Sequence, residues 1–264
     1  MTRVHCAQLA PRVADLPHNR ELSATAVRGA AARGADVIVL PELVTSGYRL
    51  NSTAEARSVA IDPDDPLLTE WGRAAPHSVV VGGFCERGPD GHLYNSAAVL
   101  DHGELIAVYR KTHLWDEEKL LFTPGDTPPP VLKTSHGRIG VLICYDLEFP
   151  ELTRKLALHG ADLLAVPTNW PLLPRPAGER APEVVIAMAA ARVNHLAIAC
   201  CDRTGTERGT HWTEGTAIID QQGRVSAETD TTDTACTDLD LHASRDKRLT
   251  PHADLFADRR PELY

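Results

Sequence analysis

The sequence has few aromatic residues and no long apolar run. Phe, Trp and Tyr make up 5% of the 264 residues, so a core must be built mostly from Ala, Val, Leu and Ile. No segment reaches the roughly 18 consecutive apolar residues that a membrane helix needs. The N-terminal residues also lack the apolar stretch of a secretory signal, because Pro11 and Arg12 interrupt it early. We therefore expect a cytoplasmic protein without a membrane partner.

Positive charge is also in short supply. Lys and Arg total 27 residues against 36 for Asp and Glu, which gives a net charge of -9. An acidic protein does not attract nucleic acid or an anionic membrane through its overall electrostatic field. The composition therefore favours a small-molecule substrate or a protein partner over nucleic acid.

The cysteines form no Cys-x-x-Cys pair, although the chain has six of them. Four of the six lie in apolar, strand-like runs, where reduced cysteines behave as small apolar side chains. Closely paired cysteines are typical of zinc sites, and disulfide frameworks are typical of small secreted proteins. We therefore expect reduced cysteines in an intracellular protein, no disulfide framework, no metal site and no cofactor.

Strand-like apolar runs alternate with helical segments along the chain. The patterns predict strands at Val4–Leu9, Asp36–Leu40, Val79–Phe84, Tyr94–Leu100, Glu104–Tyr109, Arg138–Ile143, Asp162–Val166, Leu196–Cys201, Gly215–Asp220, Arg224–Ala227 and Ala235–Leu239. They predict helices at Asn19–Arg33, Pro66–Ala75, Pro150–His159 and Glu183–Asn194. Turn residues at 101–103 and 221–223 indicate two hairpins. Many strands are continuously apolar, which is typical of α/β proteins whose sheets are covered on both faces.

No linker, low-complexity tract or short repeat interrupts this pattern. We therefore expect a single domain, residues 1–240, followed by a C-terminal tail at residues 241–264. The proline-rich stretch Pro167–Pro182 is too irregular for a helix or a strand. Irregular loops inside compact enzymes often form a lid or a pocket wall, and we expect this stretch to do so.

Cys144 lies where a predicted strand passes into a predicted helix. Such a turn brings helix amides close to the side chain, and these amides can lower a thiol pKa and supply oxyanion donors. We therefore expect a lowered pKa for this thiol. Taken alone, however, a single cysteine is more often a buried structural residue than a nucleophile.

A cysteine nucleophile needs a base, and no histidine lies in a motif that points at Cys144. His113, His195 and His211 are the candidates. A partly buried carboxylate can do the same work, because burial raises its pKa toward neutrality. Glu42 is such a carboxylate, since it follows a predicted strand directly.

Lys111 also follows a predicted strand. Between acidic neighbours its ammonium group should stay charged, and it could then stabilise an oxyanion. Viewed singly, Lys111 is an ordinary surface lysine and Glu42 a solvated or capping carboxylate. Together with Cys144, however, they share the carboxyl ends of three separate strands, which is where sites form in open α/β sheets.

Four segments resemble the nitrilase superfamily of carbon–nitrogen hydrolases, and the resemblance extends from Val4 to about Leu239. The four segments are Leu40-Pro41-Glu42-Leu43 with Ser46-Gly47-Tyr48; Tyr109-Arg110-Lys111-Thr112-His113-Leu114; Glu118 ahead of Phe122-Thr123-Pro124-Gly125-Asp126; and Gly140-Val141-Leu142-Ile143-Cys144-Tyr145-Asp146 with Phe149-Pro150-Glu151. The resemblance implies a four-layer αββα sandwich. It also implies a homodimer or higher homo-oligomer that packs through helices, with the tail at the dimer interface.

The resemblance further implies a catalytic role for each motif residue. Cys144 would attack the substrate carbon, and Glu42 would serve as the general base. Lys111 and the backbone N–H of Tyr145 would hold the oxyanion. Glu118 would orient Lys111 and the substrate, or assist proton transfer. The implied reaction uses no metal or cofactor.

The residues after the cysteine narrow the expected substrate to a small carboxamide. Tyr145-Asp146 resembles the amidase form, whereas true nitrilases carry Trp-Glu there. Asn169-Trp170-Pro171 resembles amidase branches, so we expect Asn169, Trp170 and Tyr48 to bind substrate. The alternatives are an N-carbamoyl amino acid or ureido hydrolase, a nitrilase, and a non-catalytic scaffold.

Other polar and aromatic residues have less certain roles. Trp115 and Tyr145 could wall the pocket. Arg175 and Arg180 could bind a substrate carboxylate, although solvated loop arginines are the more ordinary interpretation. Arg203 and Glu207 are expected to form a structural ion pair.

Overall fold

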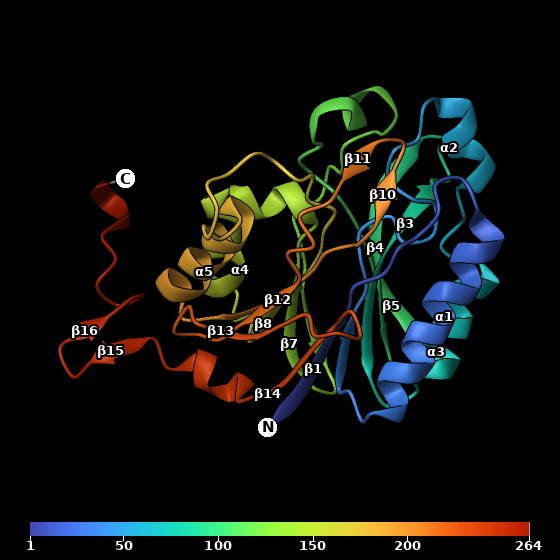
Figure 1. The fold of residues 1–264 in the computed structure, drawn as a ribbon. Coiled ribbons are helices and arrows are strands. Elements are labelled where there is room, and N and C mark those ends of the chain that lie inside the picture. The colour runs from blue at the N-terminus through green and yellow to red at the C-terminus, as the bar shows by residue number, and fades with distance from the viewer. Residues whose placement is uncertain (264) are drawn as a thin grey trace.

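Two six-stranded sheets lie face to face at the centre of the computed structural model, which describes residues 1–263 (Figure 1). The first sheet has the order β14-β1-β2-β3-β4-β5, with β1 at Thr2–Ala7, β2 at Val37–Val39, β3 at Val79–Arg87, β4 at Leu93–Asp101, β5 at Glu104–Arg110 and β14 at Thr234–Leu239. The second has the order β13-β12-β9-β8-β7-β6, with β6 at Val131–Thr134, β7 at Gly137–Val141, β8 at Leu163–Pro167, β9 at Ala197–Cys201, β12 at Ala217–Ile219 and β13 at Val225–Glu228.

Helices cover the outer face of each sheet (Figure 1). Helices α1 (Leu16–Ala32) and α3 (Pro66–Ala74) pack on the first sheet, and α4 (Pro150–Leu158) and α5 (Pro182–Asn194) pack on the second. The short helix α2 (Thr53–Val59) packs against β3. The four layers confirm the expected αββα sandwich. No helix in the described part of the chain is both long enough and apolar enough to cross a membrane.

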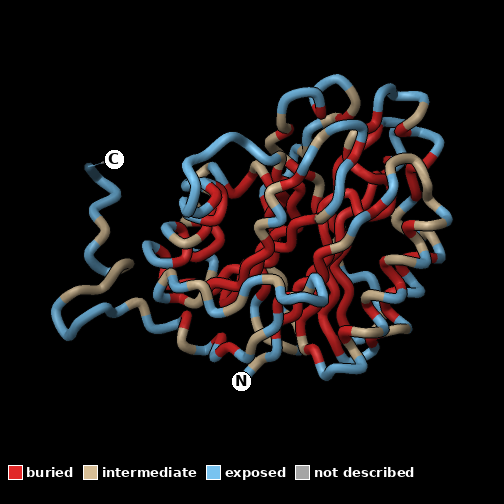
Figure 2. The backbone as a smooth tube through the Cα atoms, viewed as in Figure 1, coloured by how far each residue is buried: buried red, intermediate tan, exposed pale blue. Residues whose placement is uncertain are grey.

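The continuously apolar strands are buried on both faces, as their composition predicts. Every residue of β2, β8, β9 and β12 is buried, and Figure 2 shows this burial running through both sheets. Each of the four longer helices carries proline in its first turn, where the missing N–H removes no helical hydrogen bond. These prolines fix where each helix begins after its preceding loop.

The observed helices and strands differ from the predicted ones mainly at their ends and in the shortest elements. Helix α1 begins at Leu16 rather than Asn19, because the Asp15 carboxylate caps it by accepting from the backbone N–H of His18. Strand β7 ends at Val141, two residues earlier than predicted. The sequence analysis missed α2, β6 and two small hairpins, formed by β10 (Thr206–Glu207) with β11 (Thr210–His211) and by β15 (Arg248–Thr250) with β16 (Ala253–Asp254).

Strand directions bring several loops to one edge of the sandwich. Strands β2 and β3 are parallel, β4 is antiparallel to β3, and β5 is antiparallel to β4, so β5 runs in the same direction as β2. In the second sheet, β7, β8 and β9 are parallel. The loop after β2 meets the loop after β8 directly, because the backbone N–H of Glu42 donates to the carbonyl of Thr168 at 3.4 Å.

Gly83 on β3 allows the loop after β2 to lie against the sheet. A Cβ atom at this position would lie 2.4 Å from Leu43 N, 2.6 Å from Glu42 Cα and 2.7 Å from the carbonyl oxygen of Pro41. These are backbone atoms, so no side-chain rotation could relieve the contact. The position of Glu42 therefore depends on the missing side chain at residue 83.

The C-terminal tail leaves the sandwich beside α4 and α5 and projects away from it (Figures 1 and 2). Its first part, a 3-10 helix at Leu241–Arg245, is followed by Lys247, whose Nζ donates to the carbonyls of Asn194 and His195 at 3.0 and 2.9 Å. The tail then forms the hairpin of β15 and β16 and a 3-10 turn at Pro261–Leu263. Tyr264 lies outside the described residues.

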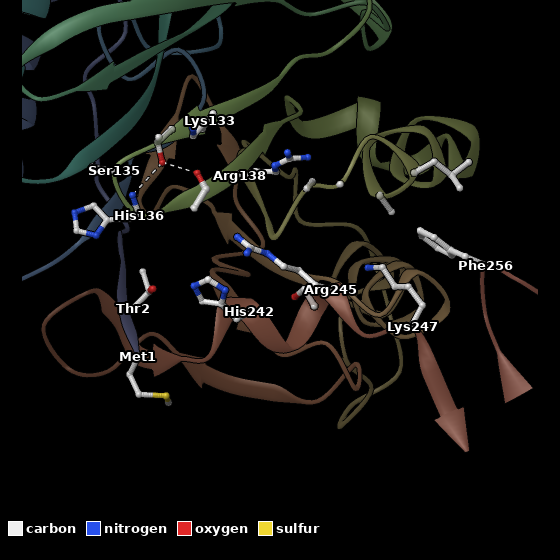
Figure 3. A pocket seen from close by; sticks show the side chains of 17 residues that line it. Met1, Thr2, Lys133, Ser135, His136, Arg138, His242, Arg245, Lys247 and Phe256 are labelled. Carbon is white, nitrogen blue, oxygen red and sulfur yellow. Dashed lines mark hydrogen bonds between the residues drawn. The ribbon is translucent and has the colours of Figure 1, made fainter. Parts of the chain in front are cut away.

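A hollow of about 840 Å³ lies between the N-terminal strand, β7 and the base of the tail (Figure 3). Basic side chains line it, including Lys133, Arg138 and Lys247. Two of its cations already have partners, since Arg245 pairs with Asp162 at 2.8 Å and Lys247 binds backbone carbonyls. Its lining includes neither Cys144 nor any other residue proposed from the sequence to take part in catalysis.

Replacing Gly83 with Ala should destabilise the protein and displace Glu42. Because the new methyl group meets backbone atoms, we expect a loss of about 1–3 kcal/mol in the free energy of unfolding. The control is Gly29→Ala in α1, where a Cβ would meet only the flexible end of Arg33, 3.5 Å away. That variant should be neutral or up to about 1 kcal/mol more stable. Equal unfolding free energies for the two variants in a urea titration would contradict this prediction.

Candidate active site

Four side chains that the sequence motifs single out come together at the shared edge. Lys111 Nζ lies 2.6 Å from Glu42 Oε1, and 2.8 and 2.9 Å from the two carboxylate oxygens of Glu118. Both carboxylates and the ammonium group are buried, and Cys144 is 6% exposed beside them. A lysine held between two buried carboxylates is not an ordinary surface lysine, so the simpler interpretation of Lys111 is wrong.

Each of these side chains is held by its local structure. The backbone N–H of Lys111, just after β5, donates to the carbonyl of Asn95 at 2.8 Å. Glu118 lies on the 3-10 helix Asp116–Leu120, and its Oε2 accepts from the backbone N–H of Trp115 at 2.9 Å. Asn95 Nδ2 donates to Glu42 Oε1 at 2.7 Å and to Glu118 Oε1 at 3.3 Å. The sequence analysis missed Asn95, because it lies inside strand β4 and belongs to no motif.

Cys144 begins the 3-10 helix Cys144–Glu148 in a backbone conformation that non-glycine residues seldom adopt. Its φ is +46°, in the left-handed region, and conformations of this kind cost about 1–3 kcal/mol. Its Sγ lies 3.9 Å from the carbonyl oxygen of Asn169. Strain of this type at a sharp turn after a strand is typical of nucleophiles that must project from a sheet.

Burial and charge set the protonation states of the buried cluster. Burial raises the pKa of Glu42 to about 7, against the opposing effect of Lys111, and the like charge of Glu118 raises it further. Burial alone would lower the pKa of Lys111, but Glu118 and Glu42 outweigh it and hold that pKa well above its usual value. The lysine is therefore charged near neutral pH, as the sequence analysis expects, and Glu42 is poised between its two states.

The expected lowering of the Cys144 pKa is wrong. Burial raises the pKa of this thiol well above its usual value, and Glu42 raises it further, while Lys111 opposes the rise. The sequence argument counted the amide dipoles at the turn but could not count tertiary burial. The resting cysteine is consequently a protonated thiol, and it becomes a nucleophile only if a neighbouring group accepts its proton.

Asp146 joins the cysteine turn to the lysine segment. Its Oδ2 accepts from Tyr109 Oη at 2.8 Å and from the backbone N–H of Ile143 at 3.2 Å. Its Oδ1 accepts from Thr112 Oγ1 at 2.9 Å and from the backbone N–H of His113 at 3.0 Å. These bonds fix Cys144 and Lys111 relative to each other, although the two residues come from different sheets. In the sequence analysis, Asp146 served only to distinguish the amidase form from true nitrilases.

Tyr48 faces the same carboxylates. Burial raises the pKa of its hydroxyl well above the usual value, with further increases from Glu118, Glu42 and Cys144. The hydroxyl therefore stays protonated and can donate a hydrogen bond. The ring packs edge-on against Trp212 at a centroid distance of 5.5 Å.

The segment after β9 holds the backbone of Tyr48 in place. Glu207 Oε2 accepts from the backbone N–H of Tyr48 at 3.0 Å, and Glu207 Oε1 pairs with Arg203 Nη1 at 2.5 Å. The expected ion pair between Arg203 and Glu207 is therefore confirmed. Its structural role, which the sequence did not reveal, is to hold the loop that carries Tyr48.

Asn169 and Trp170 lie beside the cysteine at the end of β8. Asn169 is fully buried; its Nδ2 donates to the carbonyl of Glu42 at 2.8 Å, and its Oδ1 has no partner among the described residues. With Cys144, these two residues line a cavity of about 170 Å³. Its other lining residues are Trp115, Tyr145, Glu148, Pro171, Leu173, Pro182, Glu183 and Ile186. The proline-rich stretch therefore forms a wall of this cavity, as expected.

A second cavity of about 250 Å³ adjoins the first and shares Trp115, Pro171 and Leu173 with it. Tyr48 and Glu118 are among its lining residues. The two cavities therefore lie on the two sides of the buried cluster, one with the cysteine and the other with the accessory carboxylate.

The remaining sequence candidates lie elsewhere. The ring of His113 stacks on Phe149 at a centroid distance of 3.7 Å, and His195 and His211 bind Asp246 and Thr206. None of the three histidines lines the cavity at Cys144.

The two loop arginines are also outside this cavity. Arg180 pairs with Glu228, and Arg175 is exposed in the proline-rich stretch. Within residues 1–263, no group of three or more His, Cys, Asp or Glu residues could hold a metal ion.

Comparison with known proteins gives a consistent result over the full length. A family model described as carbon-nitrogen hydrolase matches residues 3–248. The nitrilase of Pyrococcus abyssi (strain GE5 / Orsay) is 33% identical, over 100% of this chain and 99% of the relative. The N-carbamoylputrescine amidase of Arabidopsis thaliana is 32% identical, over 95% of this chain and 90% of the relative.

A solved structure is also similar to this chain over its full length. The amidase from Nesterenkonia sp. AN1 superposes with a TM-score of 0.81 at 29% identity, over 100% of this chain and 98% of that one. A variant of the same amidase shows the result of Michael addition of acrylamide at its active-site cysteine.

Proposed function

The chain belongs to the carbon–nitrogen hydrolase family, and from this membership we propose that it is a cysteine amidase that converts a small carboxamide into a carboxylic acid and ammonia. It is a hydrolase of carbon–nitrogen bonds other than peptide bonds. The observation that carries the proposal is Lys111 held between Glu42 and Glu118 beside Cys144. A scaffold protein has no use for this buried cluster, which costs desolvation energy.

In the first half of the proposed reaction, the thiol of Cys144 loses its proton as it attacks the amide carbon. Glu42 accepts that proton, and its Oε2 is suited to this because it is buried and has no hydrogen-bond partner among the described residues. The ammonium of Lys111 and the backbone N–H of Tyr145 stabilise the oxyanion. When the carbon–nitrogen bond breaks, Glu42 returns the proton to the leaving nitrogen, which departs as ammonia and leaves a thioester.

In the second half, water attacks the thioester carbon. Glu42 now takes a proton from that water, and Lys111 again faces the oxyanion. The carbon–sulfur bond breaks, the acid leaves, and the proton passes from Glu42 back to the sulfur of Cys144. Glu118 holds Lys111 in place throughout through its two short contacts.

The small cavity at Cys144 supports a small substrate. Its volume of about 170 Å³ is roughly that of five or six water molecules in the liquid. Tyr48, Asn169 and Trp170 are the proposed substrate contacts: Asn169 and Trp170 line the cavity at Cys144, where Asn169 Oδ1 is a free acceptor, and Tyr48 lines the adjoining cavity, where its hydroxyl can donate. The alternative is an N-carbamoyl hydrolase, which would release carbon dioxide with ammonia, and the similarity to the plant amidase supports keeping it.

We also propose that residues 1–240 act as one domain and that two copies associate through α4, α5 and the tail. Exposed apolar residues support this association: Leu158 on α4, Val185 and Val193 on α5, and Leu263 in the tail. All six cysteines are unpaired, which favours a reducing compartment, and so the cytoplasm, as the place of action.

Ammonia release from a panel of aliphatic, aromatic, amino-acid and carbamoyl amides tests the proposed function. Cys144→Ala should abolish release, and Lys111→Met should lower kcat by at least about 10²–10³, the usual effect of removing one oxyanion donor. The matched controls are the exposed residues Cys236 and Lys119, whose Cys236→Ala and Lys119→Met variants should keep full activity. A folded Cys144→Ala protein that still turns over would refute the mechanism.

The fall of kcat/KM on the acid side of its pH profile should follow the protonation of Glu42. Protonated Glu42 cannot accept the thiol proton, so kcat/KM should fall as pH drops below about 7, the value to which burial raises its pKa. Glu118→Gln removes a like charge that raises this pKa, and so should move this fall to lower pH. Profiles that coincide for the wild type and Glu118→Gln would argue against Glu42 as the base.

Light scattering tests the association. The wild type should have twice the chain mass, and the double variant Val185→Glu with Val193→Glu should be a monomer. Ile106→Glu is the control, because this exposed apolar residue lies on β5, away from α4 and α5. A monomeric wild type, or equal disruption by the control, would be inconsistent with an interface at α4 and α5.

A further inference from the structure

One buried carboxylate in the cavity at Cys144 has no partner. Glu183 lies in the first turn of α5, is 9% exposed, and lines the cavity that also holds Cys144. Its Oε2 is fully buried and has no hydrogen-bond partner among the described residues. A buried carboxylate without a cation or donor is costly, because burial removes its hydration and nothing replaces it.

Every other buried carboxylate in residues 1–263 has protein donors. Glu42 and Glu118 bind Lys111, Glu86 binds Arg110, Glu207 binds Arg203, and Asp162 binds Arg245. Asp101, Asp146 and Asp202 accept hydrogen bonds from hydroxyl or backbone N–H groups. The nearest arginine in sequence to Glu183 is Arg180, but it pairs with Glu228. Glu183 is therefore the exception in a fold that otherwise compensates its buried charges.

A second carboxylate, Glu148, lines the same cavity; unlike Glu183 it is exposed, so it lies on the solvent side of the cavity. The pKa of Glu148 is raised, first by burial and then by the negative charge of Glu183. The pair thus concentrates negative charge at the cavity wall, and no salt bridge of the described residues joins either carboxylate to a cation. Apart from Asn169 and Cys144, the rest of the wall is mainly apolar and aromatic, with Trp170, Leu173 and Ile186.

Resting on the amidase function proposed above, we propose that the substrate is an amide that also carries an ammonium group, which Glu183 and Glu148 bind. The amide carbon would lie at Cys144, and a short methylene chain would lie against the apolar wall. A cavity of about 170 Å³ suits a linker of a few methylene groups. An ammonium ion supplies the hydrogen-bond donors and the positive charge that the protein itself does not provide to Glu183.

The test compares two amides of the same size, 5-aminopentanamide and hexanamide, which differ by one ammonium group in place of a methyl group. The wild type should prefer the charged amide in kcat/KM by at least about tenfold, the order expected for a buried charge pair. Glu183→Gln should remove this preference, mainly by raising KM for the charged amide. The control is Glu179→Gln, an exposed carboxylate of the neighbouring loop, which should leave both substrates unchanged.

Stability gives an independent readout of the same variant. If Glu183 serves a ligand, Glu183→Gln should raise the free energy of unfolding, because it removes an uncompensated buried charge. If Glu183 only supports the start of α5, the substitution should lower stability and affect both amides equally, which would overturn the proposal.

Binding without turnover separates this proposal from the amidase function. Calorimetry with n-pentylammonium and with n-pentanol should show binding of the cation alone, and Glu183→Gln should abolish it. Hydrolysis of both amides without a preference, together with no binding of the cation, would overturn the inference and leave the amidase intact. Cation binding without hydrolysis of any panel amide would refute the amidase function and retain the cation site.

Discussion

One ammonium group shared by two buried carboxylates sets the chemistry of this site. Lys111 contacts both Glu42 and Glu118 within 2.9 Å, and all three side chains are buried. The cluster therefore carries one negative charge in excess, which works with burial to bring the pKa of Glu42 to about 7. A thiolate at Cys144 would add a second negative charge. Moving the proton from sulfur to Glu42 avoids this, because the total charge of the buried group does not change.

Residues from both sheets form this cluster and hold it in place. Glu42, Asn95 and Lys111 come from the first sheet, while Cys144 and Asn169 come from the second. Several links cross between the sheets, among them the bond from Asn169 Nδ2 to the carbonyl of Glu42 and the bonds from Asp146 to the segment after Lys111. The αββα arrangement is thus part of the site, because sliding one sheet past the other would separate the thiol from its base.

Local patterns predicted most of the strands and helices and the residues at strand ends, whereas the four layers were implied by the resemblance to a family. Apolar runs identified the buried strands, and motifs after them identified Glu42, Lys111 and Cys144. Asn95 and Glu183 could not be found in this way, since one lies within a strand, the other within a helix, and neither belongs to a motif. The direction of the Cys144 pKa shift was also out of reach, because it depends on burial by distant segments.

The pairing of β1 with β14 has a consequence for synthesis of the chain. Strand β1 lies between β2 and β14, and its whole length from Thr2 to Ala7 pairs with residues 234–239. A ribosome releases β1 long before β14, so the nascent chain carries β1 with one open edge until β14 follows. Open strand edges have unpaired backbone N–H and C=O groups, which can pair with other chains. The need for chaperones during translation should therefore depend on how soon β14 follows and covers this edge of β1.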